Sequence, residues 1–374
     1  MSELPPYEWI DSEETWQACA AILRRAPRVA IDIESNSLYA YRETVCLIQI
    51  SVPGHDFIID PLAGFPLDAL GKILVNPKTE KVLHASEYDL TLLKRHYGWD
   101  LNHLFDTMWA ARVLGYSHMG LAWFLREFYG VEQRKRLQKS NWHHRPLTAE
   151  QLAYAQVDTH YLLALRDDLE KALTEKGRLT EAQEIFVAAA HVRLPDRDFD
   201  PDGFWYLRGA RELSARRLAA LRELYLLREA EAQRRDLPPF KVLSNEALMR
   251  LAIAMPKTLE DLAASRCIGG RSMPYLGPKV LQAVQRGRKG SVPVAPDPPE
   301  RQPCGTLDRY ERLLQWRKNL ARSRGVESDV ILTRESMWAI ALHNPNSLEH
   351  LAEVAALGPH RLHLYGNAIL AELT

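Results

Sequence analysis

Two acidic residues stand two positions apart in an otherwise apolar stretch near the N-terminus. In Val29–Glu34, Asp32 and Glu34 alternate with Ile31 and Ile33. On a β-strand, residues i and i+2 share a face, so the carboxylates would lie side by side with the isoleucines packed behind them. Neighbouring carboxylates repel and are costly to bury unless a cation neutralises them. The pattern is consistent with a site for Mg²⁺ or Mn²⁺, which prefer oxygen ligands; an exposed strand edge is the alternative.

More acidic residues follow on expected helices. Glu87 and Asp89 come just after a short strand, early in a helix, where sites gather in α/β sheets. Complementing the helix dipole is the alternative role for either acid. Tyr154 and Asp158 are four residues apart and would share one helix face. The hydroxyl could then hold an attacking water while the carboxylate binds a metal; a helix boundary with a partly buried tyrosine is the alternative.

A loop that interleaves basic and aromatic residues precedes this helix, at 134–145. Lys139 and Arg145 could contact phosphates, and Trp142 could stack on a base. The alternative is a surface loop whose tryptophan packs against the domain, because tryptophan is usually largely buried.

The elements that must position these residues follow an α/β pattern. Strands are expected at 28–34, 44–52 and 55–60, and their close spacing predicts an antiparallel meander. Alternating elements follow, with strands at 81–84 and 101–105 and helices at 67–74, 87–97, 107–114, 121–129, 148–176 and 181–191. This order predicts a mixed sheet with flanking helices. Asp106 is expected to cap a helix and is not counted as a ligand, and Thr148 with Gln151 forms a capping-box signature.

Beyond residue 204 the sequence is helical and repeats itself. A shift of 89 positions aligns the two copies without a gap and superposes cap, turn and apolar residues, among them Arg228 on Arg317, Leu243 on Leu332, Pro256 on Pro345 and Gly269 on Gly358. The predicted boundaries are 1–193 for the α/β domain, 194–204 for a linker, 205–290 for the first helical domain, 291–304 for a Pro-rich spacer and 305–374 for the second helical domain.

Composition restricts the class of protein. The 374 residues are 46% hydrophobic and 26% charged, with four scattered cysteines. No membrane span, secretory signal, zinc site or disulfide framework is expected, and a reducing cytoplasm fits. Residues 203–290 carry 17 Lys and Arg against 8 Asp and Glu, whereas residues 1–190 carry 20 against 26. This asymmetry suggests a polyanion partner for the basic module, unless its arginines merely keep a helical surface soluble.

Taken together, the motifs resemble the DEDD family of 3′–5′ exonucleases, most closely its ribonuclease D branch. Asp32 and Glu34 match the first motif of that family, Asp89 the second, and Tyr154 with Asp158 the third. The resemblance therefore favours Asp89 over its neighbour in the same turn. It implies a ribonuclease H-like mixed sheet, and the loop matches a Lys-Ser…Trp…Arg-Pro-Leu run of ribonuclease D-like sequences.

Two further positions refine the resemblance. The other branch of the family has a histidine where this chain has Ala153, so the chain is of the tyrosine type. The repeat resembles two tandem HRDC domains, although the second copy lacks the Pro238-Pro239-Phe240 element of the first and is not net basic.

The resemblance implies a metal-dependent 3′–5′ exoribonuclease. Asp32, Glu34, Asp89 and Asp158 would hold two divalent ions, Mg²⁺ or Mn²⁺, and Tyr154 would orient a water. The product would be a nucleoside 5′-monophosphate, and the substrates RNA, tRNA precursors in particular. A DNA 3′–5′ exonuclease and a non-catalytic nucleic-acid-binding scaffold are the alternatives. No P-loop is present, which argues against a helicase in this chain. No nucleotide cofactor is expected.

Overall fold

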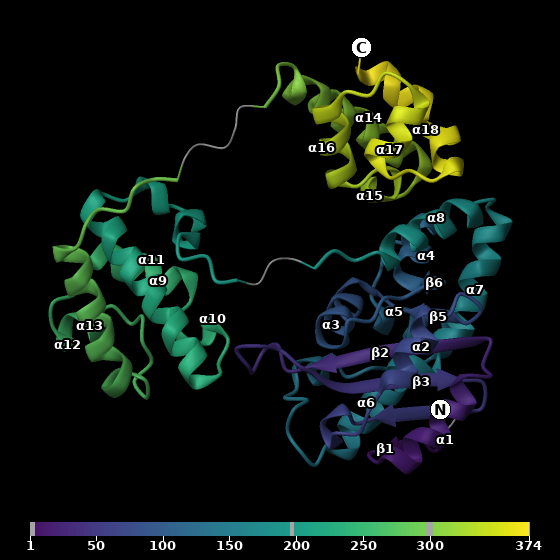
Figure 1. Cartoon of the computed structure of the whole chain (residues 1–374), viewed down its shortest axis with the longest axis horizontal. Helices are drawn as coiled ribbons and strands as arrows, with labels where there is room; N and C mark the ends of the chain where they lie inside the picture. The colour runs from purple at the N-terminus through teal and green to yellow at the C-terminus, as the bar shows by residue number, and fades with distance from the viewer. Residues whose placement is uncertain (1–3, 195–197, 297–301, 374) are drawn as a thin grey trace. The chain divides into compact units, whose positions relative to one another are not determined.

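The structure, a computed structural model, describes residues 4–194, 198–296 and 302–373 (Figure 1). Parts of the predicted linker and spacer, 195–197 and 297–301, lie outside the described residues. The chain divides into two compact units. One comprises Met1–Ser35, Val45–Leu194 and Arg301–Thr374, and the other comprises Asn36–Thr44 and Pro195–Glu300.

A six-stranded mixed sheet forms the centre of the α/β domain. Its order is β1-β4-β3-β2-β5-β6, with bounds Glu8–Ile10 (β1), Arg28–Ser35 (β2), Val45–Val52 (β3), His55–Ile59 (β4), Glu80–Leu83 (β5) and Leu104–Asp106 (β6). Strands β2, β3 and β4 form the predicted antiparallel meander, and the other pairings are parallel. The prediction missed β1. It also began β6 too early, because the left-handed φ of 56° at His103 interrupts an extended strand just before Leu104.

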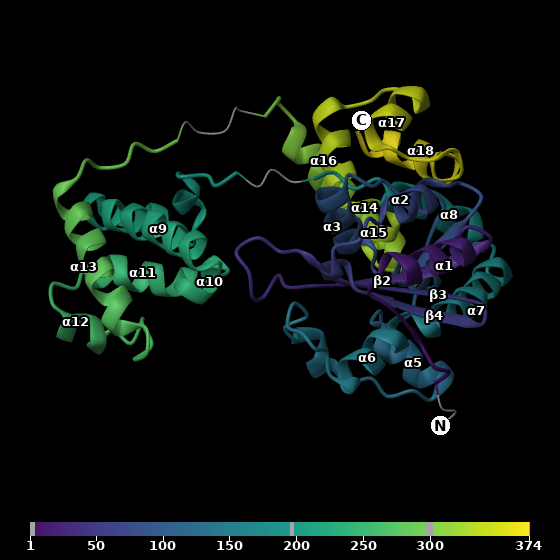
Figure 2. The ribbon, with the colours of Figure 1, turned by 60° about the horizontal axis from the view of Figure 1, so that its bottom comes forward.

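Helices cover both faces of this sheet. Their bounds are Glu13–Leu23 (α1), Asp68–Val75 (α2), Glu87–Tyr97 (α3), Thr107–Leu114 (α4), Leu121–Tyr129 (α5), Ala149–His160 (α6), Leu162–Glu175 (α7) and Leu179–Ala190 (α8), with 3₁₀ turns at Pro61–Ala63 (η1) and Lys135–Lys139 (η2). Ile31 and Ile33 pack with α1, α2 and α3, whereas Ala30 packs with α4, α5, α7 and α8. Figure 2 shows α1 and α6 on opposite sides of the strands.

The helical region consists of two copies of one arrangement. The first contains η3 (Gly203–Tyr206), η4 (Ala210–Glu212), α9 (Ala215–Arg235), α10 (Pro239–Val242), α11 (Asn245–Ala254), α12 (Leu259–Ala264) and α13 (Met273–Lys289). The second contains α14 (Thr306–Arg324), α15 (Ser328–Ile331), α16 (Arg334–His343), α17 (Leu348–Ala355) and α18 (Pro359–Leu373).

Contacts repeat at the spacing of 89 residues that the sequence shows. Arg228 donates to the carbonyl of Leu243 (3.4 Å), and Arg317 donates to the carbonyl of Leu332 (2.8 Å). Each copy encloses a hydrophobic core of its own. Among the described helices, none combines the length and the apolar composition that a membrane crossing needs.

The second copy packs against α8 of the α/β domain, within one compact unit. The Glu181 carboxylate, 1% exposed, accepts from both terminal nitrogens of Arg324 (2.8 and 2.6 Å) and from the Tyr365 hydroxyl (2.5 Å). The Glu184 carboxylate accepts from the backbone N–H groups of His360 and Arg361 (2.7 and 3.0 Å) at the start of α18. Two glutamates of one helix therefore attach this copy to the domain that precedes it.

Candidate active site

The first pair of predicted ligands lies on β2, which neighbours β3 and β5 within the sheet. Asp32 is opposite Gln49 of β3 in the antiparallel register, and Glu34 is opposite Leu47. A register shift follows directly after Glu34. Because strand residues alternate between faces, the isoleucines beside these acids enter the core on the other side, as the sequence predicted.

The third motif lies on α6, which packs across β2, β3 and β4. Thr148 and Gln151 form the predicted capping box at its start, and this fixes where the helix begins. Tyr154 and Asp158 are both buried, as a shared helix face requires. Ligand oxygens of Asp32, Glu34 and Asp158 all lie within 4.8 Å of one another.

Asp89, in the first turn of α3, lies near these three carboxylates but is not a member of the cluster that they form. Its side chain is 7% exposed, whereas Glu87 of the same turn faces solvent. Its charge contributes to the raised pKa of Glu34, and the charges of Asp32 and Asp158 act on Asp89 in turn. Burial thus favours Asp89 over Glu87 as the candidate metal ligand, in agreement with the second motif.

Burial raises the pKa of every carboxyl in the site, and repulsion by neighbouring carboxylates adds to it in three of the four. Burial raises the pKa of Asp32 to about 7. The pKa values of Glu34, Asp89 and Asp158 are also well above the usual range, because of burial first and neighbouring carboxylates second. Burial and the same carboxylates raise the pKa of Tyr154, so its hydroxyl stays protonated.

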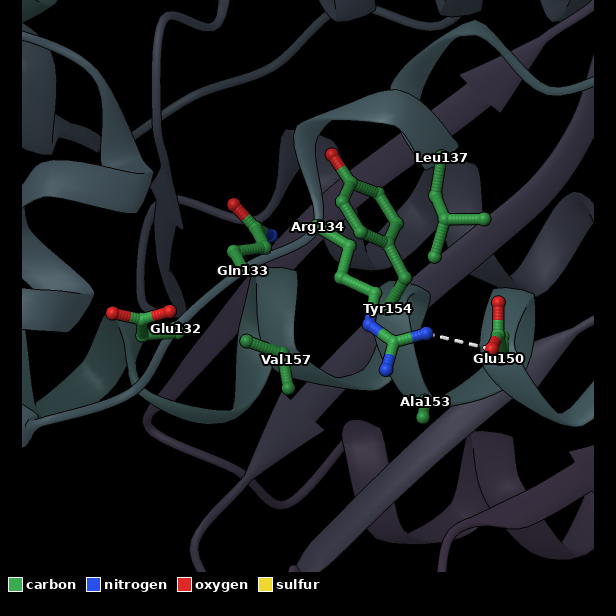
Figure 3. Close-up of a pocket in the computed structure, with 8 residues that line it drawn as sticks. All are labelled: Glu132, Gln133, Arg134, Leu137, Glu150, Ala153, Tyr154 and Val157. Carbon is green, nitrogen blue, oxygen red and sulfur yellow. Dashed lines mark hydrogen bonds and ion pairs between the residues drawn. The ribbon is translucent and has the colours of Figure 1, made fainter.

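Two hydrogen-bond donors contact the cluster. The Gln133 amide donates to Asp158, and the Tyr154 hydroxyl bonds to the same carboxylate. Gln133 lies in the segment before η2, and the spacing of residues in the sequence did not predict its contact with Asp158. Beside Tyr154 this segment and α6 enclose a cavity of about 290 Å³, with apolar lining from Leu137, Ala153 and Val157 (Figure 3).

Gln49 is a second amide that the spacing of motifs did not reveal. It is fully buried beside Asp32, and neither its Nε2 nor its Oε1 has a hydrogen-bond partner among the described residues. An unpaired amide at such a place costs free energy and calls for a water, ion or substrate partner. Its signal was a long amide side chain in the otherwise mostly apolar strand Val45–Val52, where Ser51 is the other buried polar residue.

The structure differs from the expected substrate contacts in the preceding loop. Trp142 is 1% exposed and lies with its ring centroid 6.0 Å from that of Tyr154, so its faces are covered and no base can stack on them. Arg145 forms two bonds of 2.7 Å to Asp60 and a third of 2.8 Å to the carbonyl of Cys46. Both residues hold the loop against the sheet. Lys139 is exposed and stays a candidate for phosphate binding.

The donor set fits hard divalent ions. Three clustered carboxylates offer oxygen atoms only, and repulsion among them, which raises their pKa values, would be relieved by positive charge. Asp32, Glu34 and Asp158 would hold such an ion, and Asp89 lies near enough to influence their charge.

Comparison with known proteins agrees with this geometry. Residues 7–174 match the family model described as 3′-5′ exonuclease, and residues 217–284 and 306–373 each match the HRDC domain model. Ribonuclease D of Nitrobacter hamburgensis is 30% identical over 372 residues, which cover 96% of this chain and 92% of the relative. The chain belongs to the ribonuclease D family. The predicted family, with its 3′–5′ exonuclease domain and two HRDC domains, is therefore confirmed, and so is the predicted fold class.

Solved structures extend this result. The catalytic core of RRP6 from Trypanosoma brucei is 28% identical, with a TM-score of 0.67 over 75% of this chain and 79% of that one. Escherichia coli RNase D, at 24% identity, shares the fold with a TM-score of 0.66 over 99% of both chains. This member of the ribonuclease D family spans only 29% of the length of another relative, the exosome complex component 10 homologue of Drosophila melanogaster, which is 29% identical over 262 residues.

Proposed function

We propose that the chain is a divalent-metal-dependent 3′–5′ exoribonuclease that releases nucleoside 5′-monophosphates. One observation carries the proposal: Asp32, Glu34 and Asp158 form a largely buried cluster of carboxylates next to Tyr154, in a chain of the ribonuclease D family. Asp89 would complete the ligand set, and the four carboxylates would hold two ions, Mg²⁺ or Mn²⁺. When bound, the ions supply Lewis-acid activation of water and neutralise charge on the phosphate and the leaving oxygen.

The side chains of the site have separate roles in this reaction. The carboxylates bind the cations and, once neutralised, tolerate the approach of a phosphodiester. Tyr154 orients the attacking water through its hydroxyl rather than acting as a general base, because an ordinary phenol has a pKa of about 10. Water attacks the terminal phosphorus in line with the 3′ oxygen, which leaves with a proton. The new 3′-hydroxyl end then starts the next cycle.

The apolar cavity beside Tyr154 suits the terminal nucleoside of the substrate. Leu137, Ala153 and Val157 offer a lining that a base can contact without losing a hydrogen bond. Lys139, which is exposed, would contact a phosphate further along the strand. Such a cavity would hold the base at the 3′ end of the strand.

RNA is the proposed substrate class, with tRNA precursors and other structured RNA as natural targets. The Escherichia coli protein is described as an exoribonuclease involved in structured RNA processing, which supports this choice. The first HRDC domain would bind the RNA body through its exposed cations, which include Arg217, Lys257, Arg266 and Arg271. We place the reaction in the cytoplasm.

A matched set of labelled substrates tests the proposal. RNA and DNA of one sequence, labelled at the 3′ or the 5′ end, are digested with Mg²⁺, with Mn²⁺ or with EDTA, and the products are resolved by mass. We expect 5′-monophosphates to appear from the 3′ end of RNA only when a divalent ion is present. Faster digestion of DNA would favour the DNA exonuclease, and binding without digestion would favour a non-catalytic scaffold.

A further inference from the structure

Asp106 ends β6 and immediately precedes α4, and it is fully buried. Its Oδ1 accepts from the backbone N–H groups of Met108 (2.9 Å) and Trp109 (3.1 Å). These two bonds are those of an ordinary helix cap, as the sequence predicted.

The same carboxylate also binds a turn that lies about twenty residues earlier in the chain. Oδ2 accepts from the backbone N–H and from the hydroxyl of Ser86, both at 2.8 Å, and Oδ1 accepts from the N–H of Ala85 at 3.2 Å. Asp106 therefore receives five hydrogen bonds, of which a helix cap requires only two. The other three join the end of β6 to the turn between β5 and α3.

This turn has a backbone conformation that needs support. Ala85 has a φ of 60°, in the left-handed region that side chains with a Cβ rarely adopt. Thr107 holds the same turn from its other side, because its hydroxyl donates to the carbonyl of Leu83 (3.2 Å) and lies 2.8 Å from Nδ1 of His84. Buried contacts from one junction thus fix residues 83–86.

Asp89 follows this turn directly, in the first turn of α3. In the part of the chain that the structure describes, no side-chain hydrogen bond holds its carboxylate. The direction of that carboxylate is therefore set by the backbone at the start of α3. Leu90 donates its N–H to the carbonyl of Ser86 (2.9 Å), so the residue that Asp106 holds also anchors the first helical turn.

We propose that Asp106 is a positioning residue for the active site, which fixes the turn at Ala85 and Ser86 and thereby aims Asp89 at the other carboxylates. The inference rests on the proposed function, because it gives Asp89 the role of a metal ligand. Among the described residues, Asp106 makes no hydrogen bond to the carboxylates of the site, and its positioning effect passes through Ser86 and the backbone of α3. Its negative charge also raises the pKa of the Asp89 carboxyl, and Ser86→Ala leaves that charge in place. Such outer partners commonly change metal affinity by about 10–100-fold.

Two variants of the full chain separate positioning from simple stabilisation. Asp106→Asn keeps one oxygen that can cap α4. The amide nitrogen that replaces Oδ2 cannot accept the hydrogen bonds from the N–H and the hydroxyl of Ser86. Ser86→Ala removes only the hydroxyl bond to Asp106, because the Ser86 side chain makes no cap bond to α3. Ser12→Ala is the matched control: it removes the cap of α1, whose Ser12 Oγ accepts from the N–H of Thr15 at 3.3 Å, away from the site.

Mn²⁺ binding, followed by electron paramagnetic resonance, is measured beside thermal unfolding, with Asp89→Asn as the reference for loss of the ligand. We expect Asp89→Asn to remove part of the Mn²⁺ binding, and Asp106→Asn to weaken that same part by about tenfold or more. Ser86→Ala should weaken it by about threefold, the loss that one hydrogen bond predicts. Ser12→Ala should lower the unfolding temperature and bind Mn²⁺ as the unchanged protein does.

Three results would overturn the inference or its basis. If Asp106→Asn and Ser86→Ala lose thermal stability as Ser12→Ala does and keep full Mn²⁺ affinity, Asp106 is a structural cap only. If Asp106→Asn does not fold, unchanged Mn²⁺ affinity in Ser86→Ala also shows that Asp106 is only a cap. If Asp89→Asn itself binds Mn²⁺ normally, the ligand set of the proposed function is wrong and the inference fails with it.

Discussion

Two groups of carboxylates in the α/β domain have opposite surroundings. On α8, Glu181 meets the guanidinium of Arg324 and a tyrosine hydroxyl, and Glu184 meets two backbone N–H groups. In the active site, Asp32, Glu34 and Asp158 lie beside one another, and one amide and one phenol are the donors described for the cluster.

The difference separates a structural use of charge from a functional one. A carboxylate that is paired within the protein is already neutralised, and it joins two parts of the fold. Carboxylates that repel one another raise their pKa values and destabilise the folded chain until a cation arrives from outside. The same kind of side chain thus marks a contact at α8 and a binding site at β2.

The largest effect should follow from removing one member of the unpaired group. Asp32→Asn should lower the hydrolysis of RNA by about a thousandfold or more, because a ligand for the cation is lost. Binding of RNA should change little, as measured by fluorescence anisotropy with Ca²⁺ in place of Mg²⁺. Activity within a few-fold of the unchanged chain would show that Asp32 is no ligand.

Removing one member of the paired group should act on stability instead. Glu181→Gln should lower the free energy of unfolding by about 3 kcal/mol, because Arg324 would keep its charge without a partner. Chemical denaturation measures this loss, and Mn²⁺ affinity serves as the control. A loss of Mn²⁺ affinity without a loss of stability would reverse the comparison.

The pH dependence of stability should also reflect the active site. The folded pKa of Asp32 is about 7, above its usual value of 3.8, so the folded chain keeps a proton that the unfolded chain has released. Stability in EDTA should therefore fall between about pH 4 and pH 7, by up to about 1.4 kcal/mol per pH unit, and then level off.

Asp32→Asn provides the control for this titration. The variant should show a weaker fall over the same pH range, and saturating Mn²⁺ should remove most of the fall in the unchanged chain. Thermal unfolding at half-unit pH steps makes the measurement. Identical pH profiles for the variant and the unchanged chain would contradict the raised pKa of Asp32.

The smallest effect concerns the unpaired amide beside the site. Gln49→Met should raise the free energy of unfolding of the metal-free chain by about 1 kcal/mol, because a buried polar group without a partner is replaced by an apolar one of similar size. If the amide serves bound metal or substrate, the rate of hydrolysis should fall in the same variant. A loss of stability would mean that Gln49 is satisfied in solution, for instance by water.

Patterns within single elements were sufficient to predict much of this structure. The alternation at Ile31 to Glu34 predicted which residues face the core, and the spacing of Tyr154 and Asp158 predicted a shared helix face. The shift of 89 residues predicted that α11 and α16 have the same bounds relative to their copies, and residues 245–254 and 334–343 agree.

Contacts between distant segments were beyond this reasoning. The sequence left two roles open for Trp142, stacking on a base or packing against the domain. Its burial beside Tyr154 of the helix that follows favours the second, and that contact could not be predicted from the loop alone. Gln133 approaches Asp158 from a weakly patterned loop, and the second role of Asp106 needs Ser86 twenty residues away. The role of the second HRDC copy as a partner of α8 likewise required the three-dimensional structure.

The protonated state of the carboxyl cluster has a calorimetric consequence. Because burial raises the pKa of Asp32 to about 7, this carboxyl is partly protonated near neutral pH, and a cation that enters must displace its proton into the buffer. The enthalpy of binding would then vary with the ionisation enthalpy of the buffer. The slope of the first plotted against the second would give the number of protons released per cation. Binding of a cation to the active site could thus be followed by the protons that it releases.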